Sequence, residues 1–177
     1  FILRRSAFSA SHDAGRSGID DALARSVIAQ LSAVGAVIIS NEMHREDDLA
    51  TSDVLARQPE ALHELIAASS LVVTDGASVA EEAAVLGTHA LFVSDFARER
   101  SYLTRLEESY GALEQYTPAE GDHVLARLNA ILGDLPGVEK QAELSRTKLL
   151  EELDDLVIWY RRFIETWAEN CFTPKHK

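Results

Sequence analysis

Short apolar runs alternate with amphipathic stretches along the 177 residues of this chain. Apolar runs of roughly four to eight residues that end at polar residues or glycine are typical of buried strands. Five such runs are present: Phe1–Phe8, Ala36–Ser40, Leu71–Thr74, Ala90–Val93 and Ala112–Tyr116. Because strands and helices alternate, the pattern predicts an α/β fold, with a doubly wound parallel sheet of about five strands and helices on both faces. The continuous run Ala36–Ser40 is expected to be covered on both faces.

Apolar residues three and four positions apart predict helices between these runs. The helices cover residues 20–35, 59–68, 78–86, 101–109 and 122–132. Asp20 is suited to cap the first of them, and Pro59 to begin the second. The segment Asn41–Gln58 is polar without a clear period, so we expect a loop with room for a helical turn. A turn is expected over Gly133–Gly137.

From Val138 to about Trp167 the pattern predicts one long C-terminal helix. Its second half carries apolar residues spaced four, three, four, three and four apart, which is a heptad-type seam. The seam consists of Leu149, Leu153, Leu156, Tyr160, Phe163 and Trp167. Three partners for the seam are open: the same domain, an N-terminal domain of a longer protein, or a second copy of the chain.

The chain therefore divides into a Rossmann-like α/β domain over residues 1–137, a C-terminal helix over 138–169 and a polar tail over 170–177. Because the chain opens directly on a strand, we expect it to be part of a longer protein. A function that needs two domains would then lack half of its residues here.

Charge and cysteine content narrow the class of protein. The net charge of −12 argues against a nucleic-acid surface, because binding to phosphate backbones needs a basic face. No apolar run reaches the roughly 18 residues of a membrane span. The single cysteine, Cys171, excludes an internal disulfide framework and fits a reducing compartment, so a cytoplasmic location is predicted. The six histidines are scattered without ligand spacing, so no metal site is predicted.

The turn after Thr74 is the strongest candidate for a ligand site. Gly76, Ala77 and Ser78 are small, so the backbone N–H groups that open the next helix are free to face an anion such as a phosphate. The alternative is a capping box, in which Ser78 and Glu81 satisfy those N–H groups without a ligand. The pattern leaves both interpretations open.

Two further groups extend this candidate site. His12 and Asp13 follow the first strand, and the carboxyl ends of parallel strands lie on one edge of a sheet, so His12 is placed to donate to a phosphate or to act as an acid or base. Glu82, one turn into the helix, is suited to accept hydrogen bonds from the hydroxyls of a ribose. The alternatives are a loop histidine with local hydrogen bonds and an ordinary solvated glutamate.

The stretch TDGASVAEEA at Thr74–Ala83, with LGT at Leu86–Thr88, resembles the donor-site signature of GT-B-fold glycosyltransferases and of the related UDP-GlcNAc 2-epimerase. The loop Ser9–Asp13 resembles the loop after the first strand of the C-terminal half in a predicted glycosyltransferase family of this fold. The resemblance covers Phe1 to about Trp167. It implies the donor-binding half of a GT-B enzyme, inactive without an N-terminal acceptor domain.

The resemblance also implies roles for individual residues. The donor, a nucleotide diphosphate-sugar such as a UDP-sugar, is a substrate, and no cofactor is implied. Gly76, Ala77 and Ser78 would hold its diphosphate together with catalytic His12, and Glu82 would bind the ribose. Contacts with the base or the sugar would come from Arg57, Asp95, Glu99 and Arg100.

The chain departs from the family pattern at two places. Gly76-Ala77-Ser78 stands where the family has serine and two glycines, and His89 stands where it usually has proline. The epimerase acids of the other domain are absent from this sequence. A non-catalytic Rossmann-like interaction module, whose seam meets a partner, and half of a UDP-sugar epimerase are therefore the alternative functions.

Overall fold

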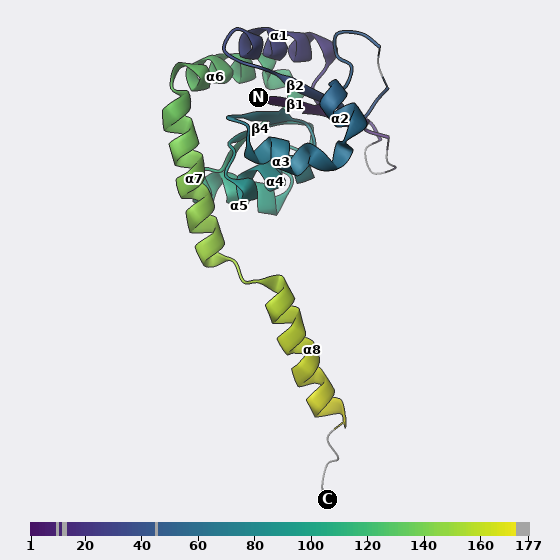
Figure 1. Ribbon diagram of the computed structural model, residues 1–177, viewed down its shortest axis with the longest axis vertical. Coiled ribbons are helices and arrows are strands. Elements are labelled where there is room, and N and C mark those ends of the chain that lie inside the picture. Colours follow the sequence, from purple (N-terminus) through teal and green to yellow (C-terminus); the bar gives the residue numbers. More distant parts are fainter. Residues whose placement is uncertain (10, 12–13, 45, 173–177) are drawn as a thin grey trace, which may run out of the picture.

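The structure is a computed structural model that describes residues 1–9, 11, 14–44 and 46–172. Five parallel strands form one sheet in the order β2-β1-β3-β4-β5 (Figure 1). The strands are β1 (Ile2–Arg5), β2 (Ile38–Asn41), β3 (Val72–Thr74), β4 (Ala90–Val93) and β5 (Leu113–Tyr116). All four pairings are parallel, so the predicted α/β fold with a five-stranded, Rossmann-like sheet is confirmed.

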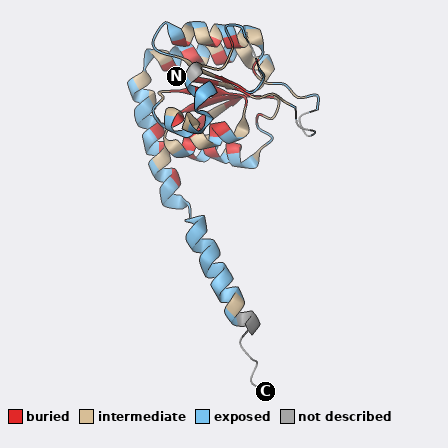
Figure 2. Cartoon of the chain, turned by 45° about the vertical axis from the view of Figure 1, so that its right-hand side comes forward, coloured by how far each residue is buried: buried red, intermediate tan, exposed pale blue. Residues whose placement is uncertain are grey.

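Helices cover both faces of the sheet (Figure 1). Helices α1 (Asp21–Ser32) and α6 (Gly121–Gly133) pack on the face that carries Leu3, Val73 and Leu91. On the other face, α3 (Leu62–Ala67), α4 (Ala77–Leu86) and α5 (Ser101–Tyr110) pack on Ile2, Val72 and Phe92. Alternate residues of a strand point to opposite faces, so a sheet covered on both faces needs apolar residues at nearly every central position. The red strands in Figure 2 show this burial.

The strand order creates a topological switch point between β1 and β3. The chain leaves β1 through α1 on one face, builds the edge strand β2, and then returns to β3 on the other side of β1. The helices that follow β1 and β3 therefore lie on opposite faces of the sheet. In doubly wound sheets of this order, ligands bind in the crevice that this divergence opens at the carboxyl ends of the two strands.

Strand β2 differs from the prediction of a strand covered on both faces. It lies at the sheet edge, and Ile38 and Ile39 are only half-buried. The outward N–H groups of the strand are bound by hydroxyls of the following loop: Ile39 N donates to Ser52 Oγ (2.8 Å) and Asn41 N to Thr51 Oγ1 (3.0 Å). This loop protects the edge from pairing with another strand.

Short helical segments complete the body. The predicted loop over residues 41–58 contains α2 (Asp53–Arg57), and a 3₁₀ turn, η2 (Pro59–Ala61), leads into α3. A second 3₁₀ turn, η3 (Pro118–Glu120), precedes α6. Helices α4 and α5 both end at a left-handed glycine, Gly87 and Gly111, as helices commonly do. No helix in the described part of the chain is long and apolar enough to cross a membrane.

The long helical C-terminal part is confirmed, but it consists of two helices, α7 (Leu135–Glu152) and α8 (Leu156–Phe172). The turn predicted over Gly133–Gly137 is wrong, because Asp134 caps α7 by accepting from Gly137 N and the helix begins at Leu135. The interruption after Glu152 has a similar cause. Asp155 accepts hydrogen bonds from the N–H groups of Val157 (2.9 Å) and Ile158 (3.1 Å) and so starts a new helix.

The two C-terminal helices have different surroundings. Helix α7 packs on α4 and α5, and it buries Ala142, Ser145 and Leu149. Ser145 Oγ also donates to the carbonyl oxygen of Tyr110 at 2.6 Å. Helix α8 extends away from the body (Figure 1). The seam is therefore divided: Leu149 is buried in the core, and the five residues from Leu153 to Trp167 are exposed.

Candidate functional site

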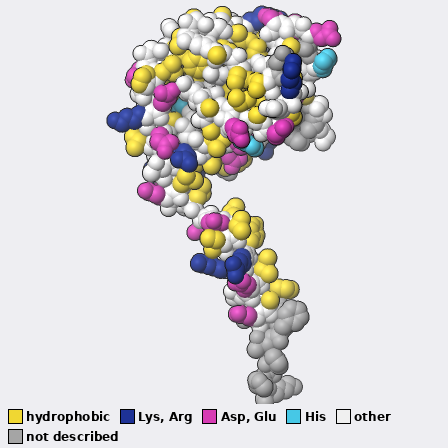
Figure 3. Space-filling view, in the orientation of Figure 1, with side chains coloured by type: hydrophobic (Ala, Val, Ile, Leu, Met, Phe, Trp, Pro, Cys, Tyr) yellow, Lys and Arg dark blue, Asp and Glu magenta, His cyan; other side chains and the backbone are white. Residues whose placement is uncertain are grey.

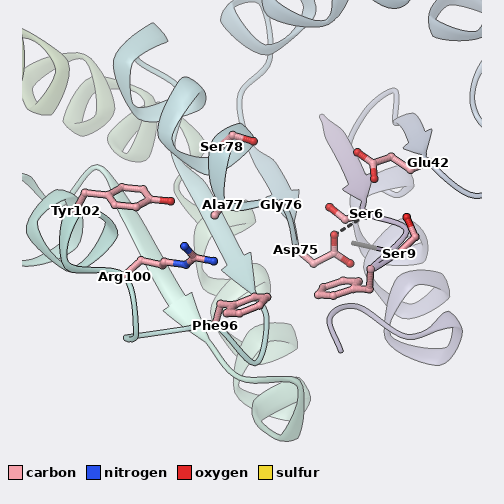
Figure 4. Close-up of a pocket in the computed structure, with 11 residues that line it drawn as sticks. Ser6, Ser9, Glu42, Asp75, Gly76, Ala77, Ser78, Phe96, Arg100 and Tyr102 are labelled. Atoms are coloured by element: carbon pink, nitrogen blue, oxygen red, sulfur yellow. Dashed lines mark hydrogen bonds between the residues drawn. The ribbon is translucent and has the colours of Figure 1, made fainter. Parts of the chain in front are cut away.

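A cavity of about 380 Å³ opens at the carboxyl ends of β1 and β3, at the switch point (Figure 4). Four segments form it: the loops after β1, β2 and β3, and the segment from the end of β4 to α5. The cavity is lined by Ser6, Phe8, Ser9, Glu42, Asp75, Gly76, Ala77, Ser78, Phe96, Arg100 and Tyr102. The residues after β3 that the sequence singled out thus lie in the crevice where the topology predicts a ligand.

Asp75 holds the two sides of this crevice together. Its side chain is buried, and its oxygens accept hydrogen bonds from Ser6 N (2.6 Å) and Ile19 N (3.2 Å), at both ends of the loop between β1 and α1. Gly18 packs directly on this carboxyl group, because a Cβ atom there would lie 2.4 Å from Asp75 Cβ. The sequence indicated only a turn at Asp75, because the hydrogen-bond partners of its side chain are 56 and 69 residues away along the chain.

Burial raises the pKa of Asp75 to about 6, although the N–H groups of Ser6 and Ile19 oppose this shift. The folded protein thus keeps the Asp75 proton over a range in which the unfolded chain, with a pKa near 3.8, has released it. The free energy of unfolding should fall as the pH rises from about 4 to 6, by about 2–3 kcal/mol from this group, and then stay level. Urea titrations across this range will measure the decline.

The matched variant for this pH dependence is Asp75→Asn, which cannot titrate. Its unfolding free energy should lack the part of the slope between about pH 4 and 6 that belongs to Asp75. An identical slope in the two proteins would show that the carboxyl ionises normally in the fold.

Two helix N-termini meet at the cavity. Helix α4 begins at Ala77, beside Gly76 and Ser78, and α5 begins at Ser101, beside Arg100 and Tyr102. No side chain among the described residues caps either helix. Each N-terminus thus brings a partial positive charge and N–H groups without a side-chain cap to the edge of the cavity, which favours an anion.

The capping box of Ser78 and Glu81 is wrong. Helix α4 begins one residue before Ser78, and its N-cap is Gly76, which has no side chain to offer. Ser78 instead lines the cavity, and the cavity lining does not include Glu81. Gly76 N donates to Thr74 Oγ1 at 3.0 Å, which sets the turn that leads into the helix.

The segment after β4 supplies a cation beside the helix ends. Two guanidinium groups lie over the Phe96 ring, those of Arg16 at 4.8 Å and Arg100 at 4.9 Å from its centroid. Arg16 is fixed by a bidentate ion pair with Glu99. Arg100 pairs with no carboxylate among the described residues and lines the cavity, so its charge is available to an anionic ligand.

The other residues that the resemblance implied lie outside the cavity lining. Asp95 accepts hydrogen bonds from the N–H and hydroxyl groups of Ser17, and Glu99 pairs with Arg16, so both hold the loop before α1. Glu82, on α4, has its Oε2 atom 3.2 Å from Nε2 of His63 on α3, and Arg57 is exposed at the end of α2. His12 falls outside the described residues.

Glu42 was not among the site residues predicted from the sequence. It follows β2 directly and lines the cavity opposite Arg100 (Figure 4). Its oxygens accept from Arg4 Nη2 at 2.6 Å and from Ala7 N at 2.9 Å. The signal for it was its position after an apolar run, since the ends of parallel strands share one edge. Phe8, with a positive φ of 48°, lines the same side of the cavity in a strained backbone conformation.

The two ends of the cavity thus differ in their polar groups. At one end, Arg100 and the N-termini of α4 and α5 favour a negative group, and at the other end Glu42, Ser6 and Ser9 offer oxygen atoms to a ligand's hydroxyl groups. Among the described residues, no three histidine, cysteine, aspartate or glutamate side chains are grouped to hold a metal ion. A molecule that combines a phosphate with hydroxyl groups fits this arrangement.

The comparisons with known proteins do not assign the chain to a family: no protein-family model matches it, and no curated protein does. The fold and the site define its class as a doubly wound, Rossmann-like α/β protein with a polar cavity at its topological switch point.

Proposed function

We propose that this cavity binds the diphosphate-sugar part of a nucleotide sugar, and that the chain is the donor-binding half of a glycosyltransferase-like enzyme. One observation carries the proposal: two uncapped helix N-termini and Arg100 meet at one end of a cavity whose other end carries Glu42. The first group suits a diphosphate, and the second suits the hydroxyls of a sugar. The resemblance of Thr74–Ala83 to GT-B donor sites supports the same ligand.

The chemistry that follows is electrostatic. As the glycosidic bond breaks, negative charge grows on the leaving diphosphate, and the N-terminus of α4 and Arg100 would stabilise that charge in place. Ser78, in the first turn of α4, offers a further hydrogen-bond donor. No nucleophile from this chain is needed, because the acceptor and its base would belong to the N-terminal domain that the resemblance implies. The catalytic role of His12 remains part of this proposal.

Isothermal titration calorimetry with UDP, GDP, dTDP and UDP-GlcNAc tests the proposal. The wild-type chain should bind at least one of these, and Arg100→Ala should weaken binding by about 10-fold or more through loss of one charge-assisted contact. Arg105→Ala is the matched control. Arg105 lies on α5, the helix that follows Arg100, but contacts Tyr110 and Glu152 instead of this cavity, so its loss should leave the affinity unchanged.

Variants of two glutamates test which part of the ligand each residue contacts. Glu42→Gln should weaken the binding of UDP-GlcNAc and leave the affinity for UDP unchanged, because Glu42 is proposed to face the sugar. If Glu82 binds the ribose as the resemblance implies, Glu82→Ala should weaken the binding of all the nucleotides by a similar factor. No binding of any nucleotide at millimolar concentration would exclude the donor role and favour the non-catalytic interaction module.

A further inference from the structure

One wall of the cavity carries a buried carboxyl group, that of Asp75, although the ligand proposed for the cavity is an anion. Asp75 lines the cavity next to Gly76, Ala77 and Ser78, the residues proposed to hold the diphosphate (Figure 4). Asp75 is only 4% exposed. A charge on its carboxyl group would therefore lie close to the charge of the ligand and be poorly screened by solvent, so the two charges would repel each other strongly.

The carboxyl group of Asp75 is fixed in this position. One of its oxygens accepts from Ser6 N at 2.6 Å and the other from Ile19 N at 3.2 Å. Gly18 fills the space beside it, since a Cβ atom on Gly18 would lie 2.6 Å from Asp75 Oδ2. Because both oxygens are bound and the adjoining space is filled, the side chain is held against turning away from a bound anion. Protonation is then the way to remove its charge.

Asp75 also competes with the ligand for the positive end of α4. It lies one residue before the N-cap, Gly76, within the short range over which a helix N-terminus stabilises a negative charge. While Asp75 is ionised, part of this stabilisation acts on its own carboxylate. When Asp75 is protonated, the helix end is available to the ligand alone.

The charged groups on the elements around Asp75 do not neutralise it. No basic side chain of the described residues forms an ion pair with it. Arg5, at the end of β1, favours the ionised carboxyl, but its guanidinium donates to Asp21 of α1 at 2.8 Å. Across the cavity, Glu42 after β2 and Arg100 before α5 carry opposite charges. The first turn of α4 has no charged side chain.

The β1–α1 loop and the overall charge complete this environment. In the loop, Arg16 is paired with Glu99, and His12 and Asp13 lie outside the described residues. The whole chain has a net charge of −12, and Figure 3 shows acidic side chains at several places on one face of the body. Burial outweighs the hydrogen bonds that oppose it and raises the pKa of Asp75 to about 6, so the free protein exchanges this proton close to neutral pH.

We propose that Asp75 makes ligand binding in this cavity depend on pH, because an anionic ligand binds together with a proton that passes from solvent to the Asp75 carboxylate. This inference rests on the proposed nucleotide-sugar site. A bound anion raises the pKa of Asp75 further, so the affinity should be highest below about pH 6 and fall as the pH rises through the pKa of the loaded protein. A neighbouring charge within about 4–6 Å changes the ratio of the two protonation states by about 10-fold or more, and linkage transfers the same factor to the affinity.

Calorimetry with UDP-GlcNAc, GDP-mannose and dTDP-glucose tests the proton linkage. The diphosphate of these probes keeps the same charge between about pH 5 and 8, whereas the terminal phosphate of UDP titrates near pH 6. The Kd of the wild-type chain should rise by about 10-fold between about pH 5 and 8. Titrations near pH 6.5 in two buffers of different ionisation enthalpy should show net proton uptake on binding.

Asp75→Asn is the variant that removes the proton exchange. Its Kd should lack the part of the pH dependence that belongs to Asp75, and its net proton uptake should fall accordingly. Asp95→Asn is the matched control. Asp95 also accepts from an N–H group of the β1–α1 loop, but its hydrogen bond is exposed and the cavity lining does not include it, so the change of affinity with pH should be retained.

The carboxyl ¹³C resonance of Asp75 in the wild-type chain provides a test that also holds if Asp75→Asn does not fold. It should titrate at a higher pH in the loaded protein than in the free protein. A wild-type Kd independent of pH, or an unchanged titration of this resonance, would overturn the proton linkage and leave the donor site standing. The full pH dependence in Asp75→Asn would assign the proton to another group. No binding of any probe at any pH would overturn the proposed function together with this inference.

Discussion

Asp75→Ala should lower the free energy of unfolding by about 2–5 kcal/mol, because it leaves two backbone donors without an acceptor at a buried position. These donors are Ser6 N and Ile19 N, which fix both ends of the loop between β1 and α1. Alanine also leaves empty space where Gly18 packs on the carboxyl group. Urea unfolding followed by circular dichroism at pH 7 will measure the loss.

Asp95→Ala is the matched control for Asp75→Ala. Asp95 also accepts from a backbone N–H of the same loop, that of Ser17 at 2.7 Å, but its hydrogen bond is exposed to solvent. Water can replace that acceptor, so the cost should stay below about 1 kcal/mol. Equal losses of unfolding free energy in the two variants would show that the burial of Asp75 adds nothing to the stability of the loop. Asp75→Ala should also weaken the binding of any ligand in the cavity. The reason is that Asp75 holds Ser6, which lines the cavity together with Ser9.

Glu114→Gln should cost about 2–3 kcal/mol at pH 7, since it removes the charge from a partly buried cluster. Glu114 in β5 accepts from Arg127 of α6 at 2.8 Å and from Tyr116 at 2.8 Å, and it lies 3.1 Å from Nε2 of buried His89. This cluster joins the residue before β4 to β5 and α6 through one carboxylate. The result should appear as an earlier urea midpoint with an unchanged slope.

The same cluster predicts a specific response to acid. Burial alone would raise the pKa of Glu114, but the hydrogen bonds from His89, Arg127 and Tyr116 outweigh it and lower the pKa to about 2. A depressed carboxyl pKa stabilises the fold above its unfolded value of 4.5, and this contribution is lost as the pH falls toward 2. The difference between wild type and Glu114→Gln should therefore be full at pH 6 and shrink toward pH 2.

Glu143→Gln is the control for this cluster. Glu143 pairs with Arg146 at 3.2 Å, and the glutamate is 62% exposed. A surface pair of this kind contributes less than about 1 kcal/mol, so the control should unfold almost as the wild type does. If Glu114→Gln were equally mild at pH 7, the ion pair at the end of the sheet would be no stronger than a surface pair.

Much of the fold could be predicted because its signals are local. The strands are short segments with apolar residues that end at polar residues or glycine, and this pattern located all five strands to within a few residues. Gly87 and Gly111 mark helix ends, since a left-handed residue there favours glycine. The break between α7 and α8 was missed because the seam spacing continues across it. The side chain of Asp155 starts the second helix by accepting hydrogen bonds from the N–H groups of Val157 and Ile158.

The candidate site could be predicted only in part. Gly76, Ala77 and Ser78 were found because small residues before a helix are a local signal, and Arg100 was found through the resemblance. Glu42 belongs to the same cavity only because the chain crosses from the edge strand β2 back to β3. No spacing in the sequence reports that crossing.

The local pattern of residues was enough to establish the α/β class, the strands, most of the helices and a turn of small residues after Thr74. The tertiary structure decided which loops share the switch point, that Asp75 joins the β1–α1 loop to the end of β3, and that α8 has an uncovered apolar stripe. The physical reason is that periodicity records the neighbours of a residue within about one helical turn or one strand. Strand order and long-range hydrogen bonds are properties of the packed whole.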